Sequence, residues 1–176
     1  MKGVVEQLAT YACYHRDQRN IITHFVGIPL IVIALLTLLS RPTLVDGTIP
    51  VTPALIVAAC AVLYYFILDR ALGVLMALLL ALCLWGGYGL ASLNTAAWLT
   101  AGIGMFVVGW VFQFIGHAFE GRKPAFVDDI IGLAIGPLFV VAEALFLMGL
   151  RKPLYQQVET QVAEMLPKMP PAKTKA

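Results

Sequence analysis

The chain has 176 residues, of which 60% are hydrophobic and 12% are charged, and its net charge is +2. A typical soluble domain is about 25% charged, and a chain of this length folded in water would bury only about 70% of its unfolded surface. A soluble fold of this sequence would have a largely apolar surface, which indicates that lipid covers much of the protein. The basic residues form short clusters rather than a long stripe, which argues against nucleic-acid binding.

The apolar segments have the lengths expected of membrane-spanning helices. Residues 3–15 predict a short interfacial helix with one apolar side, too short and too polar to cross a membrane. About 20 apolar residues cross a hydrocarbon core that is about 30 Å thick. By this measure four spans follow, over residues 21–39, 52–68, 71–93 and 96–119.

The last apolar stretch, residues 130–150, contains Gly136, Pro137 and Glu143, so we expect it to be bent or re-entrant. Four crossings put the basic clusters on the cytoplasmic side, whereas a fifth full crossing, which stays an alternative, would move Arg151 and Lys152 to the opposite side. The expected fold is all-α, a polytopic transmembrane helical bundle. It has four spans, an N-terminal interfacial helix and a bent C-terminal helix pair. Residues 1–166 are expected to form one membrane-embedded domain, followed by a disordered tail over 167–176.

The three histidines of the chain all fall near the cytoplasmic ends of the expected spans. His15 and His24 flank the start of the first span, and His117 lies at the end of the fourth. On one straight helix, nine residues turn through about 900°, which would put His15 and His24 on opposite sides. A break in the polar segment 16–20 would let them converge, and Gly109 and Gly116 make room for close neighbours along the fourth span.

Gln113, His117 and Glu120 are spaced so that they share one helical face at the membrane boundary. Three neutral imidazoles suit Fe(II), Zn or Cu and leave coordination positions open for substrate or O₂. Glu120 would then be a fourth ligand or would accept a hydrogen bond from an imidazole N–H. The alternative is that these polar residues are simply solvated at the ends of helices.

Basic side chains surround the same face, which suggests the class of substrate. A lipid with a carboxylate would find a charge partner there and an apolar slot between helices for its tail, so a fatty acid is the natural candidate. Positive-inside anchoring alone would also explain these cations. They are Arg16, Arg19, Arg122 and Lys123.

Two blocks of the sequence resemble the 2-hydroxy fatty acid dioxygenase family. The first runs from Tyr14, His15 and Arg16 through Asn20 and His24 to residues 27–29 (GIP). The second is WVFQFIGH at 110–117, continued by FEGRKPA at 119–125. The resemblance implies an Fe(II)-dependent dioxygenase of fatty acid α-oxidation. Such an enzyme cleaves the C1–C2 bond of a 2-hydroxy fatty acid with O₂, giving an acid one carbon shorter plus formate.

The resemblance also implies roles for individual residues. His15, His24 and His117 would be the iron ligands. The candidate catalytic residues beside the metal are Asn20, Gln113 and Glu120. The candidate substrate-binding residues are Tyr14, Arg16, Arg19, Arg122 and Lys123.

Two other functions stay open. A non-catalytic membrane scaffold or lipid-binding protein would purify without stoichiometric iron. A zinc-dependent lipid hydrolase would use zinc-bound water with Glu120 as the base and would work without O₂. The short loops and the polar first twenty residues, which contain no targeting signal, indicate a bacterial cytoplasmic membrane, or the endoplasmic reticulum in a eukaryote.

Overall fold

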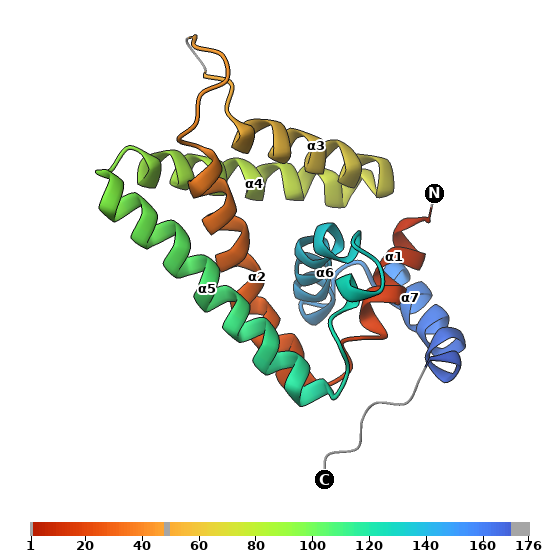
Figure 1. Ribbon diagram of the computed structural model, residues 1–176. Coiled ribbons are helices and arrows are strands. Elements are labelled where there is room, and N and C mark those ends of the chain that lie inside the picture. Colours follow the sequence, from red (N-terminus) through yellow and green to blue (C-terminus); the bar gives the residue numbers. More distant parts are fainter. Residues whose placement is uncertain (1, 48–49, 170–176) are drawn as a thin grey trace. The chain divides into compact units, whose positions relative to one another are not determined.

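The computed structural model of the chain describes residues 2–47 and 50–169. These residues form helices and no strand apart from one isolated bridge, Val45–Val51, which confirms the all-α fold class. Most of the tail expected to be disordered, residues 170–176, lies outside the described residues. The helices (Figure 1) are α1 (Val4–Ala12), α2 (Gln18–Leu39), α3 (Pro53–Leu68), α4 (Arg70–Ala91), α5 (Thr95–Glu120), α6 (Gly132–Leu147) and α7 (Lys152–Met165).

The chain divides into two compact units. The first comprises Met1–Phe25 and Phe112–Ala176, and the second comprises Val26–Val111. The first unit therefore holds α1, α6 and α7 with the start of α2 and the end of α5. The remainder of α2 and α5, together with α3 and α4, belongs to the second unit.

Glycines allow close helix packing in the second unit. The antiparallel helices α3 and α4 lie side by side (Figure 1), and Asp69 between them caps the first turn of α4. A Cβ atom on Gly73 would lie 2.7 Å from the Cα of Phe66, and one on Gly109 would lie 2.8 Å from the carbonyl oxygen of Gly27. Small residues at helix contacts are typical of membrane proteins, because they let backbones approach closely.

Among residues 2–47 and 50–169, three helices, α2, α4 and α5, are long and apolar enough to cross a membrane. The apolar helix α3 has 16 residues. At about 1.5 Å per residue it is about 24 Å long, less than a hydrocarbon core of about 30 Å. The pair α6 and α7 is bent by 117° and adds a fourth span only if it is counted as one broken span.

The C-terminal pair is bent as expected, but the bend lies at the end of the stretch 130–150 and not at Pro137. Helix α6 continues through Pro137, and the bend follows Leu147 instead. Gly149 adopts a φ of 74°, in the left-handed region that favours glycine, and the N–H of Leu150 donates to the carbonyl of Leu145 at 2.8 Å. These are the features of a glycine-based C-terminal helix cap, which ends a helix more effectively than a proline near its start.

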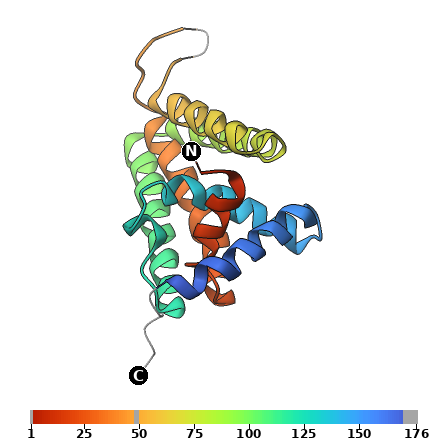
Figure 2. The same ribbon diagram turned by 90° about the vertical axis from the view of Figure 1, so that its right-hand side faces the viewer.

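In the first unit, α1 packs against both α6 and α7 (Figure 2). Leu154, Val158 and Val162 form the buried stripe of α7, at the spacing of one helical face. Helix α1 ends at Ala12 and α2 begins at Gln18. Residues 13–17, which include the start of the polar segment 16–20, therefore interrupt the helix. This break determines where the first two histidines lie.

Candidate metal centre

The break between α1 and α2 brings the three histidines together within the first unit. The Nε2 atoms of His15 and His24 are 3.0 Å apart. One ring nitrogen from each of these residues and from His117 lies within 4.8 Å of the others. All three side chains are buried, and their ring centroids are separated by 4.5, 5.0 and 5.1 Å. The cluster is therefore compact and shielded from water.

Backbone carbonyls determine which nitrogen of two of these rings carries the proton. The Nδ1 atom of His15 donates to the carbonyl of Tyr11 at 2.7 Å, and that of His24 donates to the carbonyl of Asn20 at 2.8 Å. A neutral imidazole has one N–H, so both Nε2 atoms carry lone pairs and face each other. Burial lowers the pKa of His15 well below its ordinary value, and the neighbouring His24 lowers it further. A shared proton is therefore disfavoured, and a metal cation would satisfy both nitrogens.

The distances and the unsatisfied atoms fit such a cation. Two nitrogens that each bind a metal at about 2.1 Å, at right angles to one another, are about 3.0 Å apart, which is the His15–His24 separation. The Nδ1 atom of His117 is buried and has no hydrogen-bond partner, so it is available as a third donor. Three neutral imidazoles fit Fe(II), Zn or Cu and leave positions open for other ligands.

Glu120 lies at the turn that carries His15. Its two carboxylate oxygens accept hydrogen bonds from the backbone N–H of Arg16, each at 3.0 Å, and one of them also accepts from the N–H of Asp17 at 2.8 Å. The imidazole Nδ1 atoms of His15 and His24 donate to carbonyls instead. Glu120 thus links the end of α5, which carries His117, to the turn between His15 and α2, which carries His24.

Asn20 extends the same network. Its Nδ2 group donates to Glu120 at 3.1 Å and lies 3.4 Å from the carbonyl of Tyr14, while its own carbonyl accepts from His24. Its Oδ1 atom is buried without a partner, close to Gly116. Asn20 therefore connects the turn, the end of α5 and one histidine.

Gln113 is 6% exposed, and its Nε2 group has no hydrogen-bond partner. It precedes His117 by one helical turn on α5, so the two side chains share a face of the helix. A buried amide donor without an acceptor is costly. A ligand atom that accepts a hydrogen bond from this Nε2 group would remove that cost.

An aromatic wall closes one side of the cluster. The ring of Tyr11 stacks on His15, with centroids 4.1 Å apart and planes within 4°. Phe139 of α6 contacts both rings, at 4.8 and 5.6 Å. The i, i+4 spacing placed Tyr11 beside His15, but the sequence contains no signal that would have assigned Phe139 to the site.

The predicted substrate-binding cations already have partners. Arg16 forms a two-pronged ion pair with Glu159 of α7. Arg19 pairs with Asp17 at 2.7 Å and lies 4.7 Å above the ring of Phe119. Glu159 could not be identified from the sequence, because a pair that spans most of the chain leaves no periodic signal.

The other predicted substrate-binding residues meet at Asp128. The Tyr14 hydroxyl donates to this carboxylate at 2.7 Å, and Lys123 forms an ion pair with it. Lys123 and then Tyr14 hold the pKa of Asp128 below its usual value, while burial, followed by the hydrogen bond to Asp128, raises the pKa of Tyr14 to about 12. Arg122 also interacts with neighbouring groups.

Comparison with known proteins shows what the chain resembles. A family model described as "2-hydroxy-palmitic acid dioxygenase Mpo1-like" matches residues 1–148. The chain is 32% identical over 147 residues to the 2-hydroxy-palmitic acid dioxygenase MPO1 of Saccharomyces cerevisiae, which covers 81% of this chain and 80% of that protein. No solved structure matches the chain. The matched region includes all three histidines and ends before α7.

Proposed function

Because the chain belongs to the Mpo1-like family of 2-hydroxy-palmitic acid dioxygenases, we propose that it is an Fe(II)-dependent dioxygenase of 2-hydroxy fatty acids. The family relationship ties the chain to fatty acid oxidation. The observation that carries the finer proposal is the pair of Nε2 lone pairs 3.0 Å apart beside the unpartnered Nδ1 of His117. Such a set of donors needs a cation.

His15, His24 and His117 would hold the iron. When bound, Fe(II) supplies the electrons that allow O₂ to react with a closed-shell organic acid. The carbonyls of Tyr11 and Asn20 fix the tautomers of two ligands. Glu120 acts as a positioning residue, since its carboxylate holds the turn that follows His15. This arrangement costs no reorganisation when substrate arrives, which favours catalysis.

Gln113 would contact the substrate. Its buried Nε2 group has no acceptor in the fold, whereas a 2-hydroxy acid brings three oxygens that can accept a hydrogen bond. Such a contact orients the bond that is broken, and orientation is a large part of what enzymes contribute to rate. A fatty acid that lacks the 2-hydroxyl offers one oxygen fewer and should not be turned over.

The atom balance bears on the product. Cleavage of the C1–C2 bond of a 2-hydroxy acid with one O₂ is a balanced reaction when the products are the shortened acid, CO₂ and water. The expected formate would require two further electrons and two protons. Since this balanced reaction uses O₂ as the only oxidant and needs no reductant, we propose that carbon 1 leaves as CO₂. A substrate labelled at carbon 1 distinguishes the two products directly.

The position of the histidines suggests how a lipid reaches the site. His24 lies in the second turn of α2 and His117 in the last turn of α5, and both helices are candidate spans. The site is then at the membrane boundary, and the basic residues around it favour the cytoplasmic face. A bacterial cytoplasmic membrane, or the endoplasmic reticulum in a eukaryote, would provide both the substrate and the bilayer.

The test is metal analysis of the detergent-purified protein, followed by anaerobic loading with Fe(II) and measurement of O₂ uptake. We expect near-stoichiometric iron, its loss in His15→Ala, His24→Ala and His117→Ala, and uptake with 2-hydroxypalmitate but not with palmitate. Glu164→Gln, a change at an exposed position of α7, is the matched control. Protein that binds no metal would favour the scaffold, and zinc with O₂-independent lipid hydrolysis would favour the hydrolase.

A further inference from the structure

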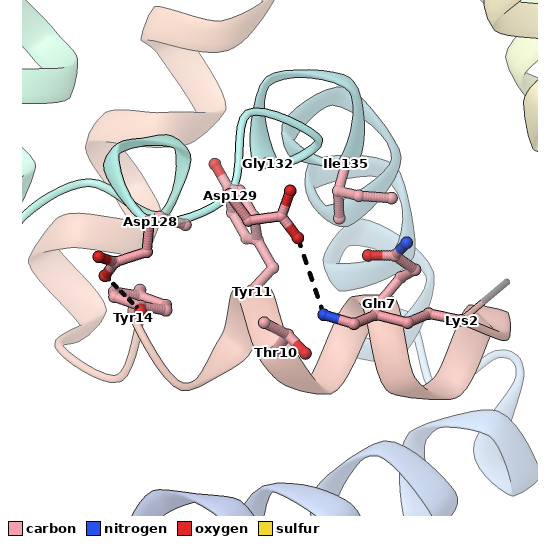
Figure 3. A pocket seen from close by; sticks show the side chains of 10 residues that line it. Lys2, Gln7, Thr10, Tyr11, Tyr14, Asp128, Asp129, Gly132 and Ile135 are labelled. Carbon is pink, nitrogen blue, oxygen red and sulfur yellow. Dashed lines mark hydrogen bonds and ion pairs between the residues drawn. The ribbon is translucent and has the colours of Figure 1, made fainter. Parts of the chain in front are cut away.

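A pocket lies beside the metal centre, between α1 and the segment that leads into α6 (Figure 3). Its volume is about 300 Å³. Charged and polar side chains in the lining include Lys2, Gln7, Thr10, Tyr14, Asp128 and Asp129, and Tyr11 and Ile135 also line the pocket. Tyr11 also stacks on His15 at 4.1 Å, so one side chain separates the pocket from a candidate metal ligand.

The two carboxylates of the pocket are not equivalent. Asp128 forms an ion pair with Lys123 and accepts a hydrogen bond from the hydroxyl of Tyr14. Asp129 uses one oxygen to accept from the N–H of Ile131 at 3.0 Å, which fixes it before α6. Its other oxygen is 3.7 Å from Nζ of Lys2, an ion pair that is longer than a hydrogen bond.

Lys2 is therefore a loosely paired cation at the pocket. Its side chain is 43% exposed, and that of Asp129 is 39% exposed, so the pair is worth little in water. By contrast, Arg16 and Arg19 hold their carboxylates at 2.7–3.1 Å. An incoming carboxylate would displace Asp129 from Lys2 more easily than it would open either arginine pair.

The segment that supplies Asp128 and Asp129 to the pocket also carries strongly exposed apolar side chains. They are Val127 (56% exposed), Ile130 (73%), Ile131 (42%) and Leu133 (48%). A pocket with charged side chains, on a segment with exposed apolar residues, fits an amphiphile. At about 300 Å³ the pocket can hold a head group and a few carbons, so a long chain must continue outside it.

We propose that this pocket binds the carboxylate end of a fatty acid, with Lys2 exchanging Asp129 for the substrate and Ile130 supporting the alkyl chain. The inference deepens the proposed function and rests on it, since it assigns the place where a 2-hydroxy fatty acid waits beside Tyr11 and His15. It also names a substrate-binding cation different from those that the sequence suggested.

The test is the affinity of the metal-free protein for a fluorescent fatty acid and for palmitate that displaces it, in neutral detergent. Lys2→Gln should weaken palmitate binding at least fivefold, because the charge partner is lost. Asp129→Asn should tighten it several-fold, because the competing carboxylate is gone while the amide oxygen still caps Ile131. The matched control, Lys168→Gln, removes an exposed cation outside the pocket and should change nothing.

The proposal requires that Lys2→Gln and Asp129→Asn change the affinity for palmitate in opposite directions. If the Lys2–Asp129 pair only stabilised the fold, both variants would shift the affinity in the same direction, and the proposal would be wrong. Ile130→Ser should weaken the binding of a 16-carbon acid more than that of an 8-carbon acid. An equal effect on both acids would show that Ile130 does not contact the alkyl chain. Because iron is absent from these assays, failure of the dioxygenase function would leave their result intact.

The same cation could take the phosphate of a phospholipid, so the ligand's source is tested separately. Phosphatidylglycerol mixed into the micelles should displace the fluorescent acid at least tenfold less well than palmitate does, and hexadecanol should not displace it. Equal displacement by phosphatidylglycerol would assign the pocket to membrane lipid instead of substrate. Displacement by hexadecanol would show that the carboxylate plays no part.

Discussion

The guanidinium of Arg16 and the carboxylate of Glu159 form a two-pronged ion pair, with N–O distances of 2.8 and 3.1 Å. Arg16 directly follows His15, whereas Glu159 belongs to α7, beyond residues 1–148 that match the family. A helix outside the matched region is thus tied to the turn that holds a candidate metal ligand. Both side chains are partly exposed, at 42% and 34%, so solvent limits the pair to about 1 kcal/mol.

Glu159→Gln should weaken metal binding about two- to fivefold, since about 1.4 kcal/mol corresponds to a factor of ten. The measurement is an anaerobic Fe(II) titration of the detergent-purified protein. Glu164→Gln, on the same helix, is the control and should titrate like the parent. Exchange of the two residues, Arg16→Glu with Glu159→Arg, should recover part of the loss. If Glu159→Gln and the control have equal affinities, α7 does not position the site.

Glu120→Gln should have a larger effect than Glu159→Gln. The carboxylate accepts from two backbone N–H groups at 2.8–3.0 Å and from Asn20 at 3.1 Å, and hydrogen bonds to charged groups contribute about 1.5–3 kcal/mol. An amide puts one N–H where an acceptor is needed. We expect a lower unfolding midpoint and at least tenfold weaker metal binding. A variant that keeps full metal affinity would show that the turn does not need this carboxylate.

The apolar patterns predicted most of the fold. The starts expected at residues 21, 71 and 96 became Gln18, Arg70 and Thr95, since the length and hydropathy of a span are local properties. The expected bend in the stretch 130–150 is present, but it follows Leu147 and does not occur at Pro137. Proline near the start of a helix is tolerated, whereas a glycine with positive φ ends it, and the backbone angle of Gly149 could not be read from its neighbours.

The clustering of the three histidines could be predicted from the sequence, but the residues that hold them in place could not. Helical periodicity required a break between His15 and His24 if they were to meet, and the chain does break there. The partners of Glu120 and Arg16 could not be predicted, because they are about a hundred or more residues away along the chain. Contacts of that separation depend on the tertiary fold and leave no trace in local spacing.

Gly116→Ala should disrupt the centre, because a Cβ atom at this position would lie 3.2 Å from Nδ1 of His24. A Cβ atom there would collide with the side chains of Asn20 and Thr23 on α2. The helices would have to separate, and metal sites tolerate shifts of only about 0.5 Å. We expect at least tenfold weaker metal binding by titration. Gly104→Ala is the matched control on α5, because its Cβ would meet nothing within 4 Å; if both variants bind metal alike, the α2–α5 approach is not critical.

Gln113→Leu should separate stability from activity. The buried Nε2 group of Gln113 has no partner, and an unsatisfied donor costs about 1–3 kcal/mol, so an apolar side chain of similar size should raise the unfolding midpoint. The same change removes the donor proposed for the substrate, so kcat/KM for 2-hydroxypalmitate should fall about tenfold or more, with iron content unchanged. Gln157→Leu, at an exposed position of α7, is the control. Loss of stability together with activity would instead mean that Gln113 supports the fold, and its role toward the substrate would be withdrawn.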